Sequence, residues 1–473
     1  MNHNKNILSK EGYLIHKKSN VTIIDKIKNE LTVTPFLPFN KNIKPDPFSV
    51  YLENEKYLCV PKYYGIENFG LPNKNKEIIG ESINIEFKGS LRPKQQIIIN
   101  SIIEKLDKDD GGLISLGCGQ GKTVLALYIA VFFKVKTLVI VHKSFLLNQW
   151  LQRAIEFTTA KIGIIQQNKI EIDGNDIVIG MLQSIAKDRY ASDIFKDFGL
   201  VIFDEAHHAP SKYFSRSLPI IACKKTLALS ATPNRSDKLE KVLFWYFGNI
   251  LYQSETEIIK NVLVKIIKYN IKHPNFKEYK QNFGEDINRP KTINKIIQIE
   301  KRNNFIITII KEILIEDQRK LLILSDRIEH LTNLTKLLNE ILENVSTSYY
   351  IGGLKQKVLD ESEKAQVIFA TYSMAAEALD IPDLNTLIMV TPRKEVEQAV
   401  GRITRKTDHP VQPLIIDIVD QLPSFIRQSY CRKRFYNKKG FINKIIEVEE
   451  NKIINESIIE EKESETNTDE FID

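Results

Sequence analysis

The stretch Leu116-Gly-Cys-Gly-Gln-Gly-Lys-Thr123 lies between an apolar run at residues 112–116 and a long apolar segment at residues 124–133. This pattern predicts a buried strand, a glycine-rich turn, and a helix that begins at the lysine. In such a turn, backbone N–H groups at the helix start hold phosphate oxygens, the lysine neutralises them and the threonine hydroxyl holds Mg²⁺. The generic pattern has glycine five residues before Gly121, where this chain has Leu116. On this stretch alone, a glycine turn without a nucleotide is the alternative.

Two carboxylates follow a second apolar run, in the segment Val201-Ile-Phe-Asp-Glu-Ala-His-His208. Ligands of open α/β sheets bind at the carboxyl ends of the strands, which is where Asp204 and Glu205 are predicted to lie. Asp204 is suited to holding Mg²⁺ through water, and Glu205 to orienting and deprotonating an attacking water. The segment Leu229-Ser-Ala-Thr-Pro233 ends another apolar run with hydroxyls that can hydrogen-bond the histidines after Glu205. A strand that ends in acidic residues by chance is the weaker alternative, because the phosphate loop precedes it.

Short apolar runs alternate with helix-length stretches in two blocks of the chain. The runs are continuously apolar, as is typical of parallel strands that are buried on both faces. The first block predicts strands at residues 112–116, 137–141, 176–181, 200–203 and 226–229. The second block predicts strands at residues 320–324, 367–370, 386–390 and 414–418. We therefore predict an α/β fold with two tandem domains, each a parallel sheet flanked by helices.

The remaining segments divide the chain further. Residues 1–88 contain short strands punctuated by prolines and predict a small N-terminal accessory domain. Residues 251–292 are polar and predict a connector between the two α/β domains, which then span residues 89–250 and 293–446. Residues 447–473 are acidic and poor in aromatic side chains, which predicts a disordered tail.

Charge is distributed unevenly along the 473 residues, whose formal net charge is +7. Residues 447–473 hold 11 acidic residues and two lysines, so the rest of the chain is strongly basic. A basic body suits a phosphate-backbone partner, because Lys and Arg contacts release counterions from nucleic acid and add affinity without reading sequence. A lysine-rich solvated surface is the alternative that charge alone leaves open.

The sequence has no sign of a membrane or secreted protein. No apolar stretch reaches the length of about 18–20 residues that a membrane-spanning helix needs. The first residues show neither the apolar core nor the small-residue cleavage site of a secretory signal. The four cysteines are scattered and form no Cys-x-x-Cys pair, which disfavours a zinc site and a disulfide framework. We therefore expect a protein of the cytoplasm or nucleus that has no membrane partner and is not secreted.

Taken in order, the phosphate loop, the Asp-Glu-Ala-His segment and the Ser-Ala-Thr segment resemble motifs I, II and III of superfamily 2 helicases. Six further segments are similar to the adenine-recognition motif and to motifs Ia, Ic, IV, V and VI of that superfamily: residues 91–95, 138–143, 179–184, 322–325, 370–382 and 398–405. The resemblance implies two tandem RecA-like domains that hydrolyse ATP with Mg²⁺ and move along a nucleic acid.

Within the superfamily, the resemblance is to the branch that contains the eukaryotic translocase XPB, the phage protein UvsW and the transcript-release DNA helicases of poxviruses and other large DNA viruses. The loop, the doubled histidine at residues 207–208 and the segment Tyr350-Ile-Gly-Gly353 carry this resemblance. It implies DNA as the partner, 3′-to-5′ travel, and work in viral transcription or in DNA repair and recombination. RNA polymerase or transcription factors are the implied protein partners, in the host cytoplasm or nucleus or in the virion. Ala378 departs from motif V, which generally has glycine there.

The resemblance also implies which residues form the site. ATP would contact Arg92, Gln95, Gly117, Cys118, Gly119, Gln120, Gly121, Lys122, Thr123 and Asp380. Hydrolysis would need Glu205, Gln398, Arg402 and Arg405, with Mg²⁺ held by Thr123 and Asp204. The motifs would be coupled by His207, Ser230 and Thr232. The nucleic-acid backbone would contact His142, Lys143, Gln183, Ser184, Arg235 and Thr371. The two arginines would reach the phosphates from the second domain, so domain closure would follow the nucleotide state.

Three alternatives to a DNA helicase stay open. A translocase that remodels duplex or branched DNA without separating strands would have the same motifs. RNA helicases with an Asp-Glu-Ala-His motif tend towards Gln-Arg-x-Gly-Arg-Ala-Gly-Arg in motif VI, whereas this chain has Gln398-Ala-Val-Gly-Arg-Ile-Thr-Arg405, so DNA is the preferred prediction. A nucleotide-binding scaffold without hydrolysis is disfavoured, because Lys122, Asp204 and Glu205 are all present.

Overall fold

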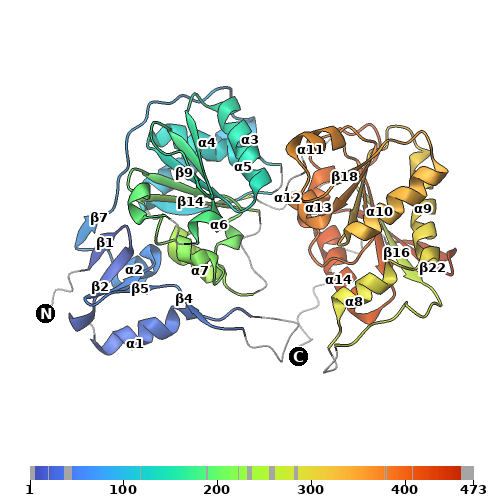
Figure 1. Ribbon diagram of the computed structural model, residues 1–473, viewed down its shortest axis with the longest axis horizontal. Coiled ribbons are helices and arrows are strands. Elements are labelled where there is room, and N and C mark those ends of the chain that lie inside the picture. The colour runs from blue at the N-terminus through green and yellow to red at the C-terminus, as the bar shows by residue number, and fades with distance from the viewer. Residues whose placement is uncertain are drawn as a thin grey trace. The chain divides into compact units, whose positions relative to one another are not determined.

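The computed structural model describes residues 6–459 apart from residues 20, 37–44, 118, 188–189, 222, 232–236, 255–260, 282–285, 378, 380 and 407. The chain divides into two compact units, residues 1–254 and 255–473, each with its own sheets and cores (Figure 1). No helix within the described ranges combines the length and the hydropathy that crossing a bilayer requires.

The first unit begins with a small five-stranded sheet in the order β5-β6-β2-β1-β7 (Figure 1). Its strands are β1 (Ile7–Ser9), β2 (Gly12–His16), β5 (Leu52–Glu53), β6 (Tyr57–Val60) and β7 (Lys74–Lys76). The elements that accompany it are α1 (Val21–Glu30), the pair β3 (Thr32–Val33) and β4 (Phe48–Ser49), and α2 (Lys62–Phe69). Its apolar side chains pack together with Leu239 and Val242 of the following domain. The accessory region and that domain therefore share a core.

An eight-stranded sheet forms the body of the first unit, in the order β11-β10-β12-β9-β13-β14-β8-β15. Five of its strands confirm the predicted ones: β8 (Gly111–Ser115), β9 (Thr137–Val141), β12 (Ile177–Met181), β13 (Leu200–Phe203) and β14 (Lys225–Ser230). The sheet is extended at its two edges by β10 (Ile162–Gln166), β11 (Lys169–Ile170) and β15 (Ile250–Gln253). Only β11 runs antiparallel to its neighbour among these described strands.

Helices cover both faces of this sheet, because its strands place apolar side chains alternately on either side. One face is covered by α3 (Pro93–Asp109), α4 (Lys122–Phe133) and α5 (Ser144–Phe157). The other face is covered by α6 (Leu182–Ile185), α7 (Glu240–Phe247) and the irregular segments near them. Since β8 and β13 are parallel strands of one sheet, the segments that follow them emerge at the same edge.

The second unit contains another eight-stranded sheet, in the order β18-β19-β17-β20-β21-β16-β22-β23. Four strands confirm the predicted ones: β17 (Leu321–Ser325), β19 (Val367–Thr371), β20 (Thr386–Met389) and β21 (Leu414–Asp420). The additional strands are β16 (Leu263–Asn270), β18 (Thr347–Tyr350), β22 (Ile442–Glu449) and β23 (Lys452–Ile459). The predicted fold class, two parallel α/β sheets and a small N-terminal sheet, is confirmed.

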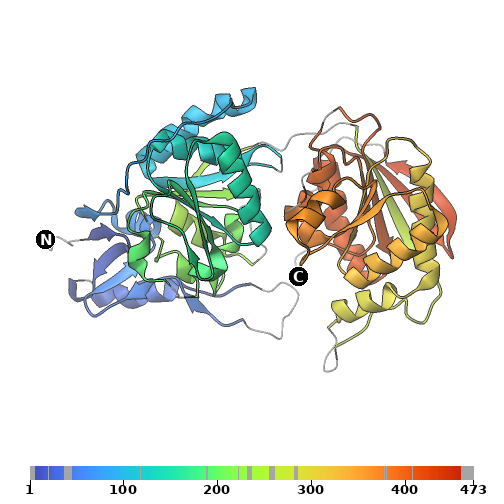
Figure 2. The ribbon, with the colours of Figure 1, turned by 45° about the horizontal axis from the view of Figure 1, so that its top comes forward.

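The helices of the second unit are α8 (Arg289–Ile296), α9 (Glu300–Leu314), α10 (Ile328–Ile341), α11 (Gln356–Ser362), α12 (Tyr372–Glu377), α13 (Glu397–Ile403) and α14 (Pro423–Lys438). Figures 1 and 2 show α9 and α10 on one side of the sheet and α13 and α14 on the other. Two buried ion pairs tie helices to β21: Arg302 to Asp420 at 2.6 Å and Arg432 to Asp417 at 2.8 Å.

The structure corrects the expected connector, residues 251–292. Residues 251–253 finish β15 in the first sheet, and β16 and the start of α8 belong to the second unit. The prediction missed β16 because Lys265 and Lys268 interrupt its apolar residues. Both lysines lie at positions of intermediate burial, and Lys268 pairs with Glu447 of β22 at 2.9 Å. One of the two charges that make this strand look like a linker is therefore paired across the sheet.

The structure also corrects the acidic tail, which was expected to be disordered. Residues 447–459 complete β22 and form β23, while residues 460–473 lie outside the described part of the chain. Glu450 and Asn451 have φ values of 49° and 66°, as in the two-residue turns that suit β-hairpins. Lys444 and Glu456 pair across the hairpin at 2.5 Å. Isoleucines between these charges supply the β propensity, so pairing overcomes the acidic composition.

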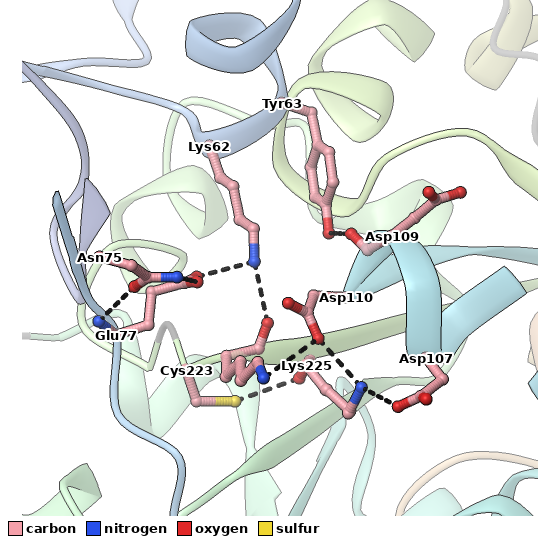
Figure 3. Close-up of polar contacts among 10 residues, drawn as sticks. Lys62, Tyr63, Asn75, Glu77, Asp107, Asp109, Asp110, Cys223 and Lys225 are labelled. Carbon is pink, nitrogen blue, oxygen red and sulfur yellow. Dashed lines mark hydrogen bonds and ion pairs between the residues drawn. The ribbon is translucent and has the colours of Figure 1, made fainter. Parts of the chain in front are cut away.

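The accessory sheet is joined to the first α/β domain through α2 (Figure 3). The Lys62 ammonium donates to the Glu77 carboxylate (2.7 Å) and to the carbonyl of Lys224 (3.0 Å). The side chains of Lys62 and Glu77 are only 11% and 5% exposed. The Tyr63 hydroxyl donates to the last carbonyl of α3 (3.1 Å), and a Cβ atom on Gly111 would lie 2.0 Å from that hydroxyl. Glycine there lets the tyrosine ring reach the body of the unit.

Candidate active site

The glycine-rich stretch forms the turn between β8 and α4. Gly119 and Gly121 have φ values of 78° and 80°, a left-handed conformation that favours glycine. A Cβ atom on Gly121 would also lie 2.2 Å from the Nε2 atom of Gln95, so a side chain there would displace the Gln95 amide. Leu116 has no such restriction, since its side chain is buried in the core with the apolar residues of α4. The turn therefore forms without glycine at the first position of the generic pattern.

Arg92 and Gln95 tie the start of α3 to this loop. The Gln95 amide donates to the carbonyls of Gln120 (3.1 Å) and Gly121 (3.4 Å), and its oxygen accepts from the N–H of Arg92 (3.0 Å). The Arg92 guanidinium donates to the carbonyl of Gly119 (3.4 Å). Both side chains thus support the loop itself. The base-reading role expected of Gln95 stays a prediction.

Lys122 and Thr123 are the first two residues of α4. The Lys122 ammonium donates to the carbonyl of Leu116 (3.2 Å) and lies 3.9 Å from the carboxylate of Glu205. The amino end of α4 adds N–H groups without helical partners and the partial positive charge of a helix start. Gly117 lies at the opening of the loop, where its N–H donates to the Gln120 side chain (2.9 Å). Loop, helix end and lysine together provide the donors that phosphate oxygens need.

Asp204 and Glu205 follow β13 directly, at the same edge of the sheet as the loop. The Trp150 indole N–H donates to the Asp204 carboxylate (2.8 Å). Burial raises the pKa of Asp204, and the neighbouring Glu205 charge raises it further. Burial alone would raise the pKa of Glu205 too, but the Lys122 ammonium and His207 together lower it. The pKa of Glu205 therefore lies below that of Asp204, and an ionised Glu205 is the form that can take a proton from water.

Three imidazole rings follow one another in tilted contact beside these carboxylates, with interplanar angles of 38° and 41°. The ring centroids of His142 and His208 are 4.1 Å apart, and those of His208 and His207 are 4.2 Å apart. The Nδ1 atom of His207 lies 3.3 Å from the Glu205 carboxylate and 3.3 Å from the Ser230 hydroxyl. We call His142, His208 and His207 the histidine stack. It connects residues at the ends of β9, β13 and β14.

The other predicted nucleic-acid contacts of the first domain lie near His142. The Gln183 amide donates to the carbonyl of His142, and Lys143 precedes α5. Ser184 is buried, and its hydroxyl accepts from the N–H of Gln167 (3.0 Å). The structure thus brings His142, Gln183 and Ser184 together at one edge, with the serine hydroxyl engaged inside the domain. Contact of these side chains with a nucleic-acid backbone stays a prediction.

In the second unit, Gln398 and Arg402 lie on α13, and Arg405 follows the end of that helix. The Arg402 guanidinium is buried and donates to the carbonyl of Ala375 in α12 (2.8 Å). Arg402 therefore connects two helices of its own domain, where the prediction expects a phosphate contact. Arg405 is half-buried, and Thr371 ends β19 with a half-buried side chain.

Four predicted site residues lie outside the described residues: Cys118, Thr232, Arg235 and Asp380. Sequence reasoning misses the side chain of Trp150, and it predicts hydrogen bonds for His208 without its ring contacts to His142 and His207. Trp150 lies on α5, far along the chain from Asp204, so no local pattern indicates their hydrogen bond. The doubled histidine was the available signal for His208, but which residue its ring contacts depends on the fold.

Comparisons with known proteins agree with this arrangement. The family model described as the res subunit of type III restriction enzymes matches residues 88–235, and the helicase conserved C-terminal domain matches residues 303–407. Over 451 residues the chain is 38% identical to a protein of Acanthamoeba polyphaga mimivirus that is named as a candidate ATP-dependent RNA helicase. The alignment covers 93% of this chain and 86% of the mimivirus protein. The chain belongs to the superfamily 2 helicases.

This helicase is also similar to a candidate helicase of Invertebrate iridescent virus 6, with 28% identity over 452 residues, covering 90% of this chain and 98% of the relative. Among solved structures, a fragment of a candidate HsdR subunit of a type I restriction enzyme from Vibrio vulnificus YJ016 matches with a TM-score of 0.55. That match has 17% identity and covers 78% of this chain and 71% of the other, so it shows the fold alone. The predicted superfamily is confirmed, and the helicase is related to helicases of large DNA viruses.

Proposed function

We propose that this superfamily 2 helicase is an ATP-dependent DNA helicase or translocase of a large DNA virus. The observation that carries the proposal is the arrangement of Lys122, Asp204 and Glu205 at one edge of the first sheet, with the ammonium 3.9 Å from the Glu205 carboxylate. A lysine over a glycine loop beside two half-buried carboxylates suits phosphoryl transfer to water. That reaction needs positioning and charge neutralisation more than covalent chemistry.

The residues of this site fit ATP and Mg²⁺. Two glycines with positive φ shape the loop backbone, and the adjacent helix start provides N–H donors for phosphate oxygens. Lys122 would hold the phosphates, and Thr123 and Asp204 would hold Mg²⁺, which neutralises phosphate charge when bound. Glu205 would orient the attacking water and accept its proton. Cys118 and Asp380 would add nucleotide contacts.

The second domain would complete the site through motif VI. Gln398 and Arg405 are the proposed contributors, while Arg402 would first have to leave its bond to Ala375. An arginine supplied to the phosphates in this way adds about 10³–10⁵ in rate. Closure of the domains would then follow the nucleotide state. Each closure would move the backbone contacts of one domain relative to the backbone contacts of the other domain. Contacts to the nucleic-acid backbone read no base sequence.

DNA is the proposed nucleic acid, because motif VI differs from that of the RNA helicases with an Asp-Glu-Ala-His motif. Travel from 3′ to 5′ and a role in viral transcription, transcript release or DNA repair are proposed from the branch that the motifs resemble. RNA polymerase or transcription factors are the proposed partners, in the host cytoplasm or nucleus or in the virion. An RNA helicase is the second candidate function, because the mimivirus relative has that name.

The test is the rate of ATP hydrolysis measured in parallel with single-stranded, duplex and forked DNA and with RNA, using Lys122→Ala as the control. We expect stimulation by DNA and loss of all hydrolysis in the control. If only RNA stimulates hydrolysis, RNA and not DNA is the nucleic-acid partner. If no nucleic acid stimulates hydrolysis, the helicase or translocase function is rejected. A strand-displacement assay beside a protein-displacement assay separates a helicase from a translocase.

A further inference from the structure

Helix α14 presents one exposed face on which every charge is positive. Its residues recur at intervals of three and four, which places them on one side of the helix. We call these four residues the basic face of α14: Arg427, Tyr430, Arg434 and Lys438. All four side chains are exposed, and Tyr430 is 58% exposed. The opposite side of the helix is buried through Phe425, Gln428, Arg432 and Tyr436.

The cations of this face have no carboxylate partner among the described residues, and α14 itself contains no Asp or Glu. Neighbouring cations do have partners: Arg432 pairs with Asp417 at 2.8 Å, and Lys439 lies 3.9 Å from Glu397. The Arg434 guanidinium lies 3.9 Å from the sulfur of Cys431, a weak acceptor. Three positive charges therefore face solvent without compensation.

The helix starts at the edge of the sheet where the proposed nucleic-acid contact Thr371 lies. β21 ends at Asp420 and α14 begins at Pro423, while Thr371 ends the parallel strand β19. Three strand spacings of about 4.8 Å put roughly 14 Å between the ends of β19 and β21. Arg393 follows β20 between them, its side chain is 48% exposed, and its carbonyl accepts from Arg432 of α14. Thr371, Arg393 and the start of α14 therefore lie along one edge of the sheet, and Arg427 is the member of the basic face nearest to that start.

We propose that the basic face of α14 binds the single strand of nucleic acid that passes Thr371. The two arginines and the lysine contact phosphates, and Tyr430 stacks on a base. This inference rests on the proposed function, because it assigns the continuation of the same strand. It adds a binding surface on a helix outside the motor motifs.

The exposed ring distinguishes nucleic acid from an acidic protein segment as the occupant. An acidic peptide needs the cations but has no use for a solvent-exposed aromatic ring between them. Surfaces that bind single strands combine positive charge with aromatic platforms, because every base has a face that stacks. Arg427 and Arg434 are seven residues apart, about 10 Å along the helix at 1.5 Å per residue. A base stacked on Tyr430 then has an arginine on either side for its flanking phosphates.

The experiment measures binding of a fluorescent 20-nucleotide single-stranded DNA, and of RNA of the same length, by anisotropy at several KCl concentrations without ATP. The test variant is Arg427→Gln/Arg434→Gln/Lys438→Gln. Each lost phosphate contact lowers the slope of log affinity against log salt by about 0.7, so we expect a slope smaller by about 2. Tyr430→Ala is expected to weaken binding about tenfold at fixed salt, and Tyr430→Phe to restore it.

The matched control is Lys301→Gln/Lys311→Gln/Lys336→Gln, which removes the same charge from α9 and α10 on the other side of the sheet. Its slope is expected to equal that of the wild type. A test variant with an unchanged slope, or a control with an equal loss, would overturn the proposal and leave the face to an acidic protein partner. Failure of the wild type to bind any nucleic acid would instead reject the proposed function. Thermal unfolding of each variant checks that the fold is retained.

Discussion

Glu205 has a left-handed backbone, with a φ of 47°, directly after the buried strand β13. Residues other than glycine rarely adopt this conformation, which costs about 1–2 kcal/mol. Here it accompanies a carboxylate that lies within 4 Å of both Lys122 and His207. Strained residues of this kind cluster at functional sites, so the backbone itself supports the assignment of Glu205 as the proposed base.

Replacing Glu205 tests that assignment. In Glu205→Gln the amide cannot accept a proton from water, so we expect ATP hydrolysis to fall by about 10²–10⁴. ATP binding should persist, because Lys122 and the loop are unchanged. Phosphate release and binding of a fluorescent ATP analogue measure the two properties separately. A rate near that of the wild type would show that another group activates water, and Glu312→Gln on the exposed side of α9 is the control.

The histidine stack gives a second test at the same scale. His208 lies between His142, beside the proposed nucleic-acid contacts, and His207, which contacts Glu205. We expect His208→Ala to reduce the stimulation of hydrolysis by nucleic acid by about 5–150-fold, the usual range of coupling between sites. Hydrolysis without nucleic acid should persist.

His208→Phe keeps a flat ring between the two histidines and should recover most of the stimulation. The measurement is the ratio of hydrolysis rates with and without saturating nucleic acid. An undiminished ratio in His208→Ala would show that the stack does not transmit the signal.

Single residues were predictable where a short motif follows a buried strand. Lys122, Asp204 and Glu205 were predicted to lie together at one edge of the sheet, and the structure places them there, while their roles in hydrolysis stay predictions. The contact of Trp150 with Asp204 and the ring contacts of His208 join segments far apart in the sequence. A single sequence does not indicate which residues far apart in the chain come into contact.

Secondary-structure elements were predictable in proportion to their burial. The central strands are continuous apolar runs and were found, whereas β16, β22 and β23 lie toward one edge of the second sheet. Edge strands alternate charged and apolar residues, and their charges pair only once the strands are adjacent, as Lys268 and Glu447 do. The turn at Glu450 and Asn451 also needs left-handed residues, and the Asn between isoleucine runs was the available signal.

The junction of β17, α9 and α10 gives a pH-dependent prediction for these elements. His330 is buried, with its ring nitrogens 3.1 Å from the Ser325 hydroxyl and 3.1 Å from the Asn303 side chain. Burial, and then the charge of Arg302, hold the pKa of His330 well below its ordinary value. The unfolded chain therefore takes up this proton first as the pH falls below about 6.5, and the folded state loses up to about 1.4 kcal/mol per pH unit.

We expect hydrogen exchange in residues 321–332 to accelerate between pH 7 and pH 5, after correction for the intrinsic pH dependence of exchange. His330→Gln keeps a donor and an acceptor but does not titrate there, so its stability should change less with pH. Equal pH dependence in the two proteins would show that the histidine stays neutral in both states or is protonated in both.

At the scale of the whole molecule, the alternation of apolar runs predicted two α/β domains and the structure confirms that class. The attachment of the accessory sheet was not predictable, because it rests on contacts such as that of Lys62 with the carbonyl of Lys224. Tyr63 and Tyr64 lie beside lysine in the sequence, yet Tyr64 is buried and Tyr63 reaches the body of the unit. These contacts depend on how two separately folded regions meet.

The junction of the first unit supports a stability prediction. Lys62→Met leaves the Glu77 carboxylate buried without its partner, which typically costs about 3–5 kcal/mol. Urea unfolding followed by tryptophan fluorescence is suited to the measurement, because the Trp245 ring makes an edge-to-face contact with Tyr64 of α2, with the ring centroids 5.4 Å apart. The double variant Lys62→Met/Glu77→Gln should recover part of the loss. A single variant as stable as the wild type would mean that water reaches the carboxylate.

The attachment of the accessory sheet to the first α/β domain has a mechanical consequence. Helix α2 fixes the accessory sheet to the first α/β domain, which holds the phosphate loop. The sheet therefore moves together with that domain and does not act as a hinge. If the protein translocates, a partner bound to the accessory sheet would move the same distance in each ATP turnover as the first α/β domain. A large domain fused to the accessory sheet would add hydrodynamic resistance without blocking the nucleotide site. It would therefore slow translocation along the strand, while the number of steps per ATP would stay the same.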